Sequence, residues 1–227
     1  MRDIIYIVEQ EIVDKMDCNV EVTGIVSNDL TVCDPKWAAF EHVVMDSIGG
    51  TFTVSAVNHN INVITLIDAT GFTGNMVLKK PYFFVGTPRA TNAEWEDFAL
   101  NLRDKLPAIW MVEPTAERPN YDPKSPIERE SDVRLEFIDT NDTTNWITTK
   151  THSIRLQSLY NMYTEFVKVI NKNPLFNRDR LTEGKIKNLT KFGTETKSGF
   201  KDHIIDANLT GLDTRLTLVI NKGECKC

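Results

Sequence analysis

The sequence has few cysteines, no basic excess and no long apolar run. Its 227 residues include four cysteines, 26 basic and 32 acidic side chains, for a formal net charge of −6. Dedicated nucleic-acid binders usually carry a basic excess, so the charge argues against that class. No stretch approaches the roughly 18 apolar residues of a membrane span, and residues 1–9 lack the apolar core of a secretion signal. We therefore expect an intracellular protein with reduced thiols and no membrane segment.

Catalytic motifs are also absent. The sequence contains no G-x-S-x-G elbow, no phosphate-binding G-x-x-x-x-G-K-[ST] loop and no G-x-G-x-x-G turn. Pairs of neighbouring acidic residues fall on predicted solvent-facing positions, where acid–base catalysis would lack a desolvated pocket. No histidine lies in an H-E-x-x-H or H-x-E frame; the four are His42, His59, His152 and His203. The sequence therefore predicts a non-enzyme without a cofactor.

Two segments have residue types that bind metals. Cys225 and Cys227 could offer two thiolates to zinc, but Cys18 and Cys33 are too far apart to form the second tight pair of a zinc site. The Asp- and Asn-rich residues 139–145 lack the glycine and distal glutamate of a calcium loop, so we expect a turn there. We predict no bound metal, and expect Cys18 and Cys33 to be small buried apolar residues.

Residues 1–86 are predicted to form a β-rich part with an N-terminal helix. Residues 3–16 place apolar side chains on one helical face. Residues 36–45 fit either a short helix or a strand. Alternating or apolar runs bounded by turn residues predict strands at residues 18–34, 51–57, 63–67 and, interrupted by Pro81, 76–85.

Residues 87–227 are predicted to combine helices with strands. A Thr-x-x-Glu capping box at Thr91 indicates a helix that ends before Pro107. Apolar residues at spacings of three and four indicate a long amphipathic helix over residues 153–171. Strands are expected at residues 108–112, 133–138 and 212–220. The predicted fold class is α+β: a mostly antiparallel sheet backed by a long helix, with residues 1–86 as an added β-rich part.

Two segments are candidates for contacts between subunits. Residues 113–132 contain prolines that remove backbone donors, so we expect an extended loop there. Residues 180–201 contain six basic and two acidic side chains with interspersed glycines, and could contact DNA phosphates or an acidic neighbour. The alternatives are a flexible loop without contacts for the first segment and a solvated, mobile hairpin for the second. The candidate contact residues are Pro114, Pro119, Pro123, Pro126, Lys185, Lys187, Lys191 and Lys197.

The predicted order of helices and strands over residues 91–220 resembles the tail terminator family of tailed bacteriophages. The matching stretches are residues 95–106, 107–112, 133–138, 156–170 and 203–220. The resemblance implies a sheet covered by helices on one face, assembled as a hexameric ring that caps the tail tube and meets head-completion proteins. The family has no catalytic motif to carry over. Residues 18–86 depart from its smaller members, and the length leaves open another ring of the neck or tail.

We therefore expect a structural virion protein, assembled in the host cytoplasm, that forms a hexamer or dodecamer with other neck and tail proteins. An acidic lumen would let DNA pass without adhering. The alternative from another class is a binding module that uses the β-rich part for a ligand or glycan, which an exposed Trp37 and Phe52 would favour. A metal-dependent enzyme ranks third, and tightly bound zinc would favour it.

Overall fold

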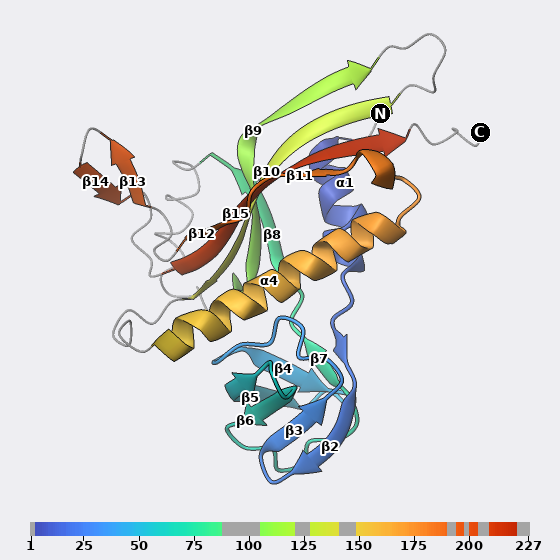
Figure 1. The fold of residues 1–227 in the computed structure, drawn as a ribbon. Helices are drawn as coiled ribbons and strands as arrows, with labels where there is room; N and C mark the ends of the chain where they lie inside the picture. The colour runs from blue at the N-terminus through green and yellow to red at the C-terminus, as the bar shows by residue number, and fades with distance from the viewer. Residues whose placement is uncertain are drawn as a thin grey trace.

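The computed structural model describes residues 3–87, 105–120, 128–140, 149–189, 194–197, 200–203 and 209–221. These residues form two large sheets, a short N-terminal helix and one long helix (Figure 1). The first sheet has seven strands in the order β1-β7-β4-β5-β6-β3-β2. Their bounds are β1 Asn19–Val20, β2 Val22–Val26, β3 Asp29–Val32, β4 Val43–Asp46, β5 Thr51–Asn58, β6 Val63–Leu66 and β7 Met76–Leu78.

The first sheet curls into a small barrel-like unit, which we call the barrel (Figure 1). Its two end strands, β1 and β2, are separated in the chain only by Glu21, so the ends of the sheet must approach each other. Alternate side chains fill the interior: Val44 and Asp46 of β4 are buried, whereas Val43 and Met45 are exposed. Residues 36–45, which fit either a helix or a strand by sequence, form turns followed by the start of β4.

The second sheet has the strand order β11-β15-β10-β9-β8, and β12 also pairs with β15. Its strands are β8 Tyr82–Gly86, β9 Ala108–Asn120, β10 Glu128–Thr140, β11 Thr182–Glu183, β12 Lys187–Leu189 and β15 Leu209–Asn221. A separate hairpin consists of β13 Thr194–Lys197 and β14 Phe200–His203. Only β8 and β9 are parallel among these described pairs. Pro81 lies where the chain leaves β7 of the barrel and enters β8, because proline cannot continue a hydrogen-bonded ladder.

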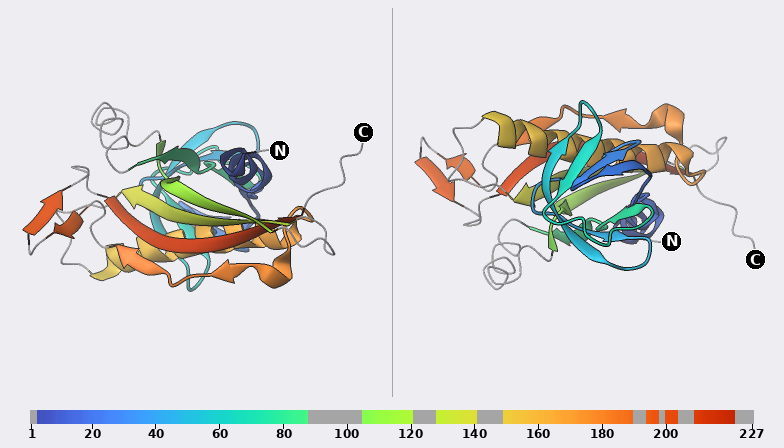
Figure 2. Two further views of the ribbon diagram at one scale, coloured as in Figure 1. Left: turned by 90° about the horizontal axis from the view of Figure 1, so that it is seen from above. Right: turned by 90° about the horizontal axis from the view of Figure 1, so that it is seen from below.

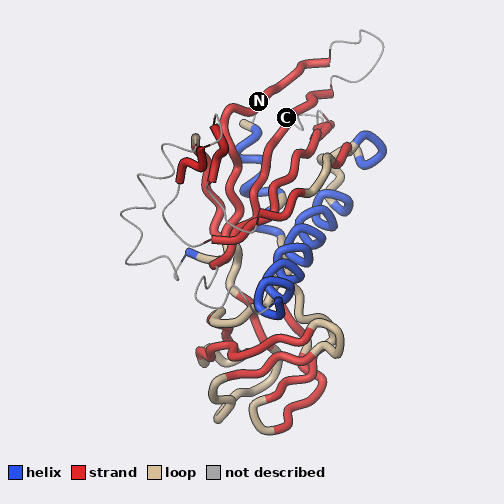
Figure 3. The backbone as a smooth tube through the Cα atoms, turned by 60° about the vertical axis from the view of Figure 1, so that its left-hand side comes forward, coloured by secondary structure: helices blue, strands red, loops and turns tan. Residues whose placement is uncertain are grey.

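The helices are α1 Ile4–Glu11 and α4 Thr149–Lys172, followed respectively by the 3-10 turns η1 Val13–Lys15 and η3 Arg178–Arg180. Helix α4 lies between the barrel and the second sheet (Figures 1 and 3). The ring of Phe137 on β10 meets those of Tyr163 and Phe166 edge-on, each at 5.6 Å between centroids. In Figure 2, α4 runs along β15, whereas α1 lies toward β9. The long helix predicted over residues 153–171 is confirmed, as are the N-terminal helix and the closing strand.

The opposite face of the second sheet carries its own buried apolar cluster. Trp110 of β9 stacks on Phe84 of β8 at 5.8 Å, and Ile138 of β10 and Leu209 of β15 complete the cluster with neighbouring residues. Both faces of the β8–β9–β10 part are therefore buried, which explains the near-continuous apolar run over residues 108–112.

The predicted α+β class is wrong, because the described part of the chain is mostly β, with 47% strand and 21% helix. The largest local error concerns residues 113–132, which were expected to form an extended loop. Instead β9 continues to Asn120 and β10 begins at Glu128, so that Pro114 and Pro119 lie within a strand (Figure 3). Proline is tolerated in a strand that has one open edge, and pairing with β10 outweighs the local preference for a loop.

Other predictions have mixed outcomes. Cys33 is exposed, so its expected burial is wrong, whereas Cys18 is partly buried. The helix expected after Thr91, and Pro123, Pro126, Lys191, Cys225 and Cys227, lie outside the described residues. The division of the chain after residue 86 stays a prediction, although β8, which ends at Gly86, pairs with β9 rather than with the barrel.

Candidate functional site

A recess of the described surface lies where β9 and β10 bend. The pairing of these strands shifts from Ala116 with Asp132 to Val112 with Arg134, so that residues 113–115 of β9 have only Val133 opposite them. Such a bulge bends a strand and increases its twist. A pocket of about 540 Å³ lies at the bend, lined by Val112, Glu113, Asp132, Val133, Arg134, Thr182, Gly184, Arg215, Leu216 and Thr217.

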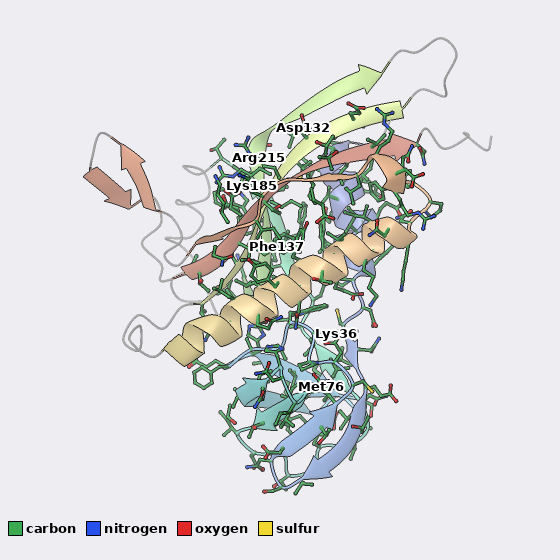
Figure 4. All side chains as sticks on the ribbon, in the orientation of Figure 1. Lys36, Met76, Asp132, Phe137, Lys185 and Arg215 are labelled. Carbon is green, nitrogen blue, oxygen red and sulfur yellow. The ribbon has the colours of Figure 1, made fainter. Side chains whose placement is uncertain are left out.

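Charged side chains from three adjacent strands line this pocket. Asp132 of β10 accepts a 2.6 Å hydrogen bond from the hydroxyl of Thr217, its cross-strand partner on β15. Arg134 and Arg215 form the next cross-strand pair, and Glu113 of β9 adds a second carboxylate. Figure 4 shows Asp132 and Arg215 near each other, where the strands cross. The lining therefore presents both signs of charge on one face, which suits a polar protein segment better than a simple anion or cation.

Gly184 closes the pocket on the β11 side because it approaches β15 very closely. Its N–H donates a 2.7 Å hydrogen bond to the carbonyl of Arg215. A Cβ atom at residue 184 would lie 2.9 Å from the same carbonyl oxygen, which only glycine avoids. The next residue, Lys185, is exposed beside the pocket (Figure 4).

A buried ionic cluster continues from the pocket along the same face. The Arg134 guanidinium bridges Glu136 and Asp213, which are cross-strand partners. Burial raises the pKa of Glu136 to about 7; the charge of Arg134 opposes this shift and that of Asp213 adds to it. A carboxyl group with such a pKa can exchange a proton near neutral pH. Proton exchange by Glu136 is the chemistry that this arrangement supports.

A second ionic cluster joins the barrel, β10 and α4. Asp139 at the end of β10 lies 3.1 Å from Nε2 of His42 and 3.2 Å from Nη1 of Arg155. Arg155 also donates to the carbonyl of Phe40 in the barrel at 3.3 Å and to the Thr140 hydroxyl at 2.5 Å. Burial opposes the ionisation of Asp139, but His42 and Arg155 together hold its pKa below the usual value. We interpret this cluster as an anchor between the two parts of the chain.

The far half of β9 has an open edge. Its pairing with the parallel strand β8 ends at Val112 with Gly86, yet β9 continues through residues 113–120. Within the described residues, no strand pairs with this half on the side away from β10. Figure 3 shows the β9–β10 hairpin extending beyond the helices. An open strand edge offers unpaired N–H and C=O groups to another chain.

The structure brings together parts of the two predicted contact segments. Pro114 follows Glu113 on β9, and Lys185 follows Gly184, so the two lie next to lining residues on opposite sides of the pocket. Lys187 is exposed and begins β12, and Pro119 lies near the described end of β9. Lys197 is the last residue of β13 in the separate hairpin and is not a lining residue.

Sequence reasoning missed the charged residues of β10 and β15. Arg134 and Glu136 alternate with the buried residues Val133, Leu135 and Phe137, which is the available signal for a strand with one charged face. That pattern indicates half-buried strands but contains no information on which residues face each other across the pair.

Metal and membrane sites find no support in the described ranges. No group of three or more His, Cys, Asp or Glu side chains in those ranges is arranged to hold a metal ion. Among the described helices, α4 included, none combines the length and apolar composition that crossing a membrane requires.

Comparisons with known proteins leave the family of this chain open. No protein-family model, no curated protein and no solved structure matches it.

Proposed function

We propose that this chain is a non-enzymatic structural subunit that forms a ring at the neck or tail end of a tailed phage. The ring would join head-side proteins to the tail around the DNA channel. The observation that carries the proposal is the open edge of β9 over residues 113–120, in a hairpin that extends beyond the body of the protein. The proposal also draws on the resemblance of residues 91–220 to tail terminators, although four short strands, β11 to β14, lie between α4 and β15.

An open strand edge supports assembly through main-chain hydrogen bonds. A strand from a neighbouring chain can extend the sheet there, and the mixed charges of the adjacent pocket can select the neighbour. When the edge of one copy meets a different surface of the next, the contact is head-to-tail and can close into a ring. A ring of subunits that each carry a formal charge of −6 would repel DNA phosphates from its lumen.

The alternative function, a ligand-binding module, would be favoured by exposed aromatic side chains, and the structure does not show them at Trp37 and Phe52. Trp37 is only 1% exposed, and its indole N–H donates to the carbonyl of Lys79 at 3.1 Å. Phe52 is half-buried and meets Phe72 edge-on, with 5.1 Å between the ring centroids. Neither side chain forms an exposed aromatic platform for a sugar or other flat ligand.

The mass of the purified chain in solution tests the proposal. Light scattering at low and high salt should detect a discrete hexamer or dodecamer, and electron microscopy should show rings. A monomer at every concentration would contradict a self-assembling ring. Purified protein that is monomeric and contains stoichiometric zinc would instead favour an enzyme or a metal-dependent binding module.

Substitutions at Thr115 test the open edge itself. Thr115 lies in the bulge and has no cross-strand partner on β10, so proline there spares the hairpin and removes one N–H from β9. We expect Thr115→Pro to shift the assembly toward monomers and the matched Thr115→Val, which keeps the N–H, to leave it intact. Equal assembly of both variants would show that the edge is not used.

A further inference from the structure

The barrel contains the longest uncharged stretch of the described surface. Residues 47–67 include no Asp, Glu, Lys or Arg, although 26% of the whole chain is charged. These residues form β5, β6 and the turns beside them. Most of the exposed large hydrophobic side chains also lie in the barrel: Ile25, Val26, Val43, Met45, Ile48, Ile61 and Ile67, against only Tyr6 and Tyr82 elsewhere in the described ranges.

Several of these side chains share one surface. Met45 of β4 lies between Val77 of β7 and Thr51 of β5 in the strand register. Val43 pairs with Thr53, whose carbonyl accepts a 2.9 Å hydrogen bond from the N–H of Ile67. We call this set of six residues the outer barrel face: Val43, Met45, Thr51, Thr53, Ile67 and Val77.

The outer barrel face is suited to a protein neighbour. Covering exposed Val, Met and Ile side chains with another protein surface removes apolar area from water, which is favourable. The face contains no cation, so it has nothing with which to hold nucleic-acid phosphates. Beyond β6, its border is acidic: Asp29 accepts a hydrogen bond from Thr65 at 2.7 Å, and Asp68 follows Ile67 directly.

The complementary surface occurs on the same chain, beside β12 of the second sheet. Lys185 and Lys187 are both exposed around β12, and Figure 4 shows Lys185 far from Met76 of the barrel. The aliphatic stem of a lysine covers apolar and threonine surface, while its ammonium group reaches a nearby carboxylate. These lysines can therefore contact Val43 and Ile67 and pair with Asp29 and Asp68 of another copy.

We propose that the outer barrel face of one copy is covered by the Lys185–Lys187 segment of the next copy. The two surfaces differ, so a contact between them is head-to-tail, the geometry that closes rings. The inference rests on the proposed ring, because it names the surfaces by which neighbouring subunits meet.

A matched pair of isoleucines tests the face. Ile67 and Ile61 are 63% and 64% exposed, but Ile61 lies in the turn at the opposite end of β6, outside the outer barrel face. We expect Ile67→Lys to weaken self-association about tenfold or more, since a positive charge would be placed in an apolar contact and would face the lysines of the next copy, and Ile61→Lys to leave it unchanged. The readout is mass by light scattering over a dilution series. Equal masses for the two variants would overturn the proposal.

Exchanging the charges of Asp68 and Lys187 tests whether the Lys185–Lys187 segment is what covers the outer barrel face. Asp68→Lys and Lys187→Asp should each weaken association, and the double variant should recover it, which only a direct pairing of the two residues between copies explains. Loss of assembly in Ile67→Lys without recovery in the double variant would overturn the lysine segment as the occupant. Assembly that depends on Thr115 but not on Ile67 would overturn this inference and keep the proposed ring. A wild-type monomer would overturn both.

Discussion

Glu136 on β10 and Asp213 on β15 face each other across the second sheet, and one guanidinium, that of Arg134, is bonded to both. The Arg134 nitrogens lie 2.7 Å from Glu136 and 2.8 Å from Asp213. Glu136 is only 3% exposed, so two carboxylates share one positive charge in a place that water hardly reaches. The cluster is therefore better accommodated when Glu136 holds a proton.

The pKa of Glu136 predicts a pH dependence of stability. The pKa is about 7 in the folded chain against 4.5 for a free side chain, so the folded state binds the proton more tightly. The free energy of unfolding should fall as the pH rises from about 4.5 to about 7, by at most about 3 kcal/mol, and stay level above. Glu136→Gln should remove most of this fall, as urea unfolding near pH 5 and pH 8 would show. A fall as steep as in the wild type would contradict the assignment.

The anchor around Asp139 predicts a large loss of stability. Arg155 is 2% exposed, and Asp139→Asn would remove its buried carboxylate partner and leave only Glu41, 3.9 Å away. We expect the free energy of unfolding to drop by about 3 to 5 kcal/mol, measured in urea. Glu41→Gln is the control, because its carboxylate is 3.9 Å from Arg155 on a side chain that is 39% exposed, and should change stability by less than about 1 kcal/mol. Similar effects of the two substitutions would contradict the anchor.

Alanine substitutions at two glycines in the loop between β6 and β7 should lower stability by different amounts. Gly71 and Gly74 both have positive φ, 83° and 71°. A Cβ at residue 71 would meet nothing within 4 Å, whereas one at residue 74 would lie 2.2 Å from Oγ of Ser47, which donates to the carbonyl of Thr73. Gly71→Ala should destabilise by about 1 to 2 kcal/mol from backbone strain, and Gly74→Ala by more. Thermal unfolding of both variants provides the measurement, and the reverse order would refute this account.

The hydroxyl of Tyr163 ties α4 to β11. It donates to the carboxylate of Glu183, and burial followed by this hydrogen bond raises the pKa of the phenol well above its usual value. Tyr163→Phe should lower stability by about 1 kcal/mol and speed amide hydrogen exchange in residues 182–184. Tyr160→Phe is the matched change, since its exposed hydroxyl bonds to Asn188 and its loss should matter less. Unchanged exchange in Tyr163→Phe would show that β11 is held by β15 alone.

Elements with strong local periodicity were predictable. The spacing of three and four apolar residues indicated α4, and the alternation after Leu212 indicated β15. The segment around Pro114 and Pro119 was misread, because prolines favour loops locally. The energy that holds it as a strand comes from pairing with β10, which in turn pairs with β15.

The candidate site was predictable only in fragments. Pro114 and Lys185 were chosen from separate segments, and only the folded sheet shows them on opposite sides of one pocket. Arg134, Glu136 and Asp213 form one cluster because of the register between β10 and β15. A shift of one residue in that register would place different side chains opposite each other.

The sequence by itself determined the acidic charge, the lack of catalytic motifs, the main helix and most of the strands, because composition and periodicity are local properties. Only the tertiary structure decided that the chain is mostly β, that Pro81 separates two sheets, and that β9 has an open edge. It also decided which charges are buried together and which apolar side chains share the outer barrel face. These features depend on the pairing of strands distant in sequence, whose hydrogen bonds and contacts outweigh local preference.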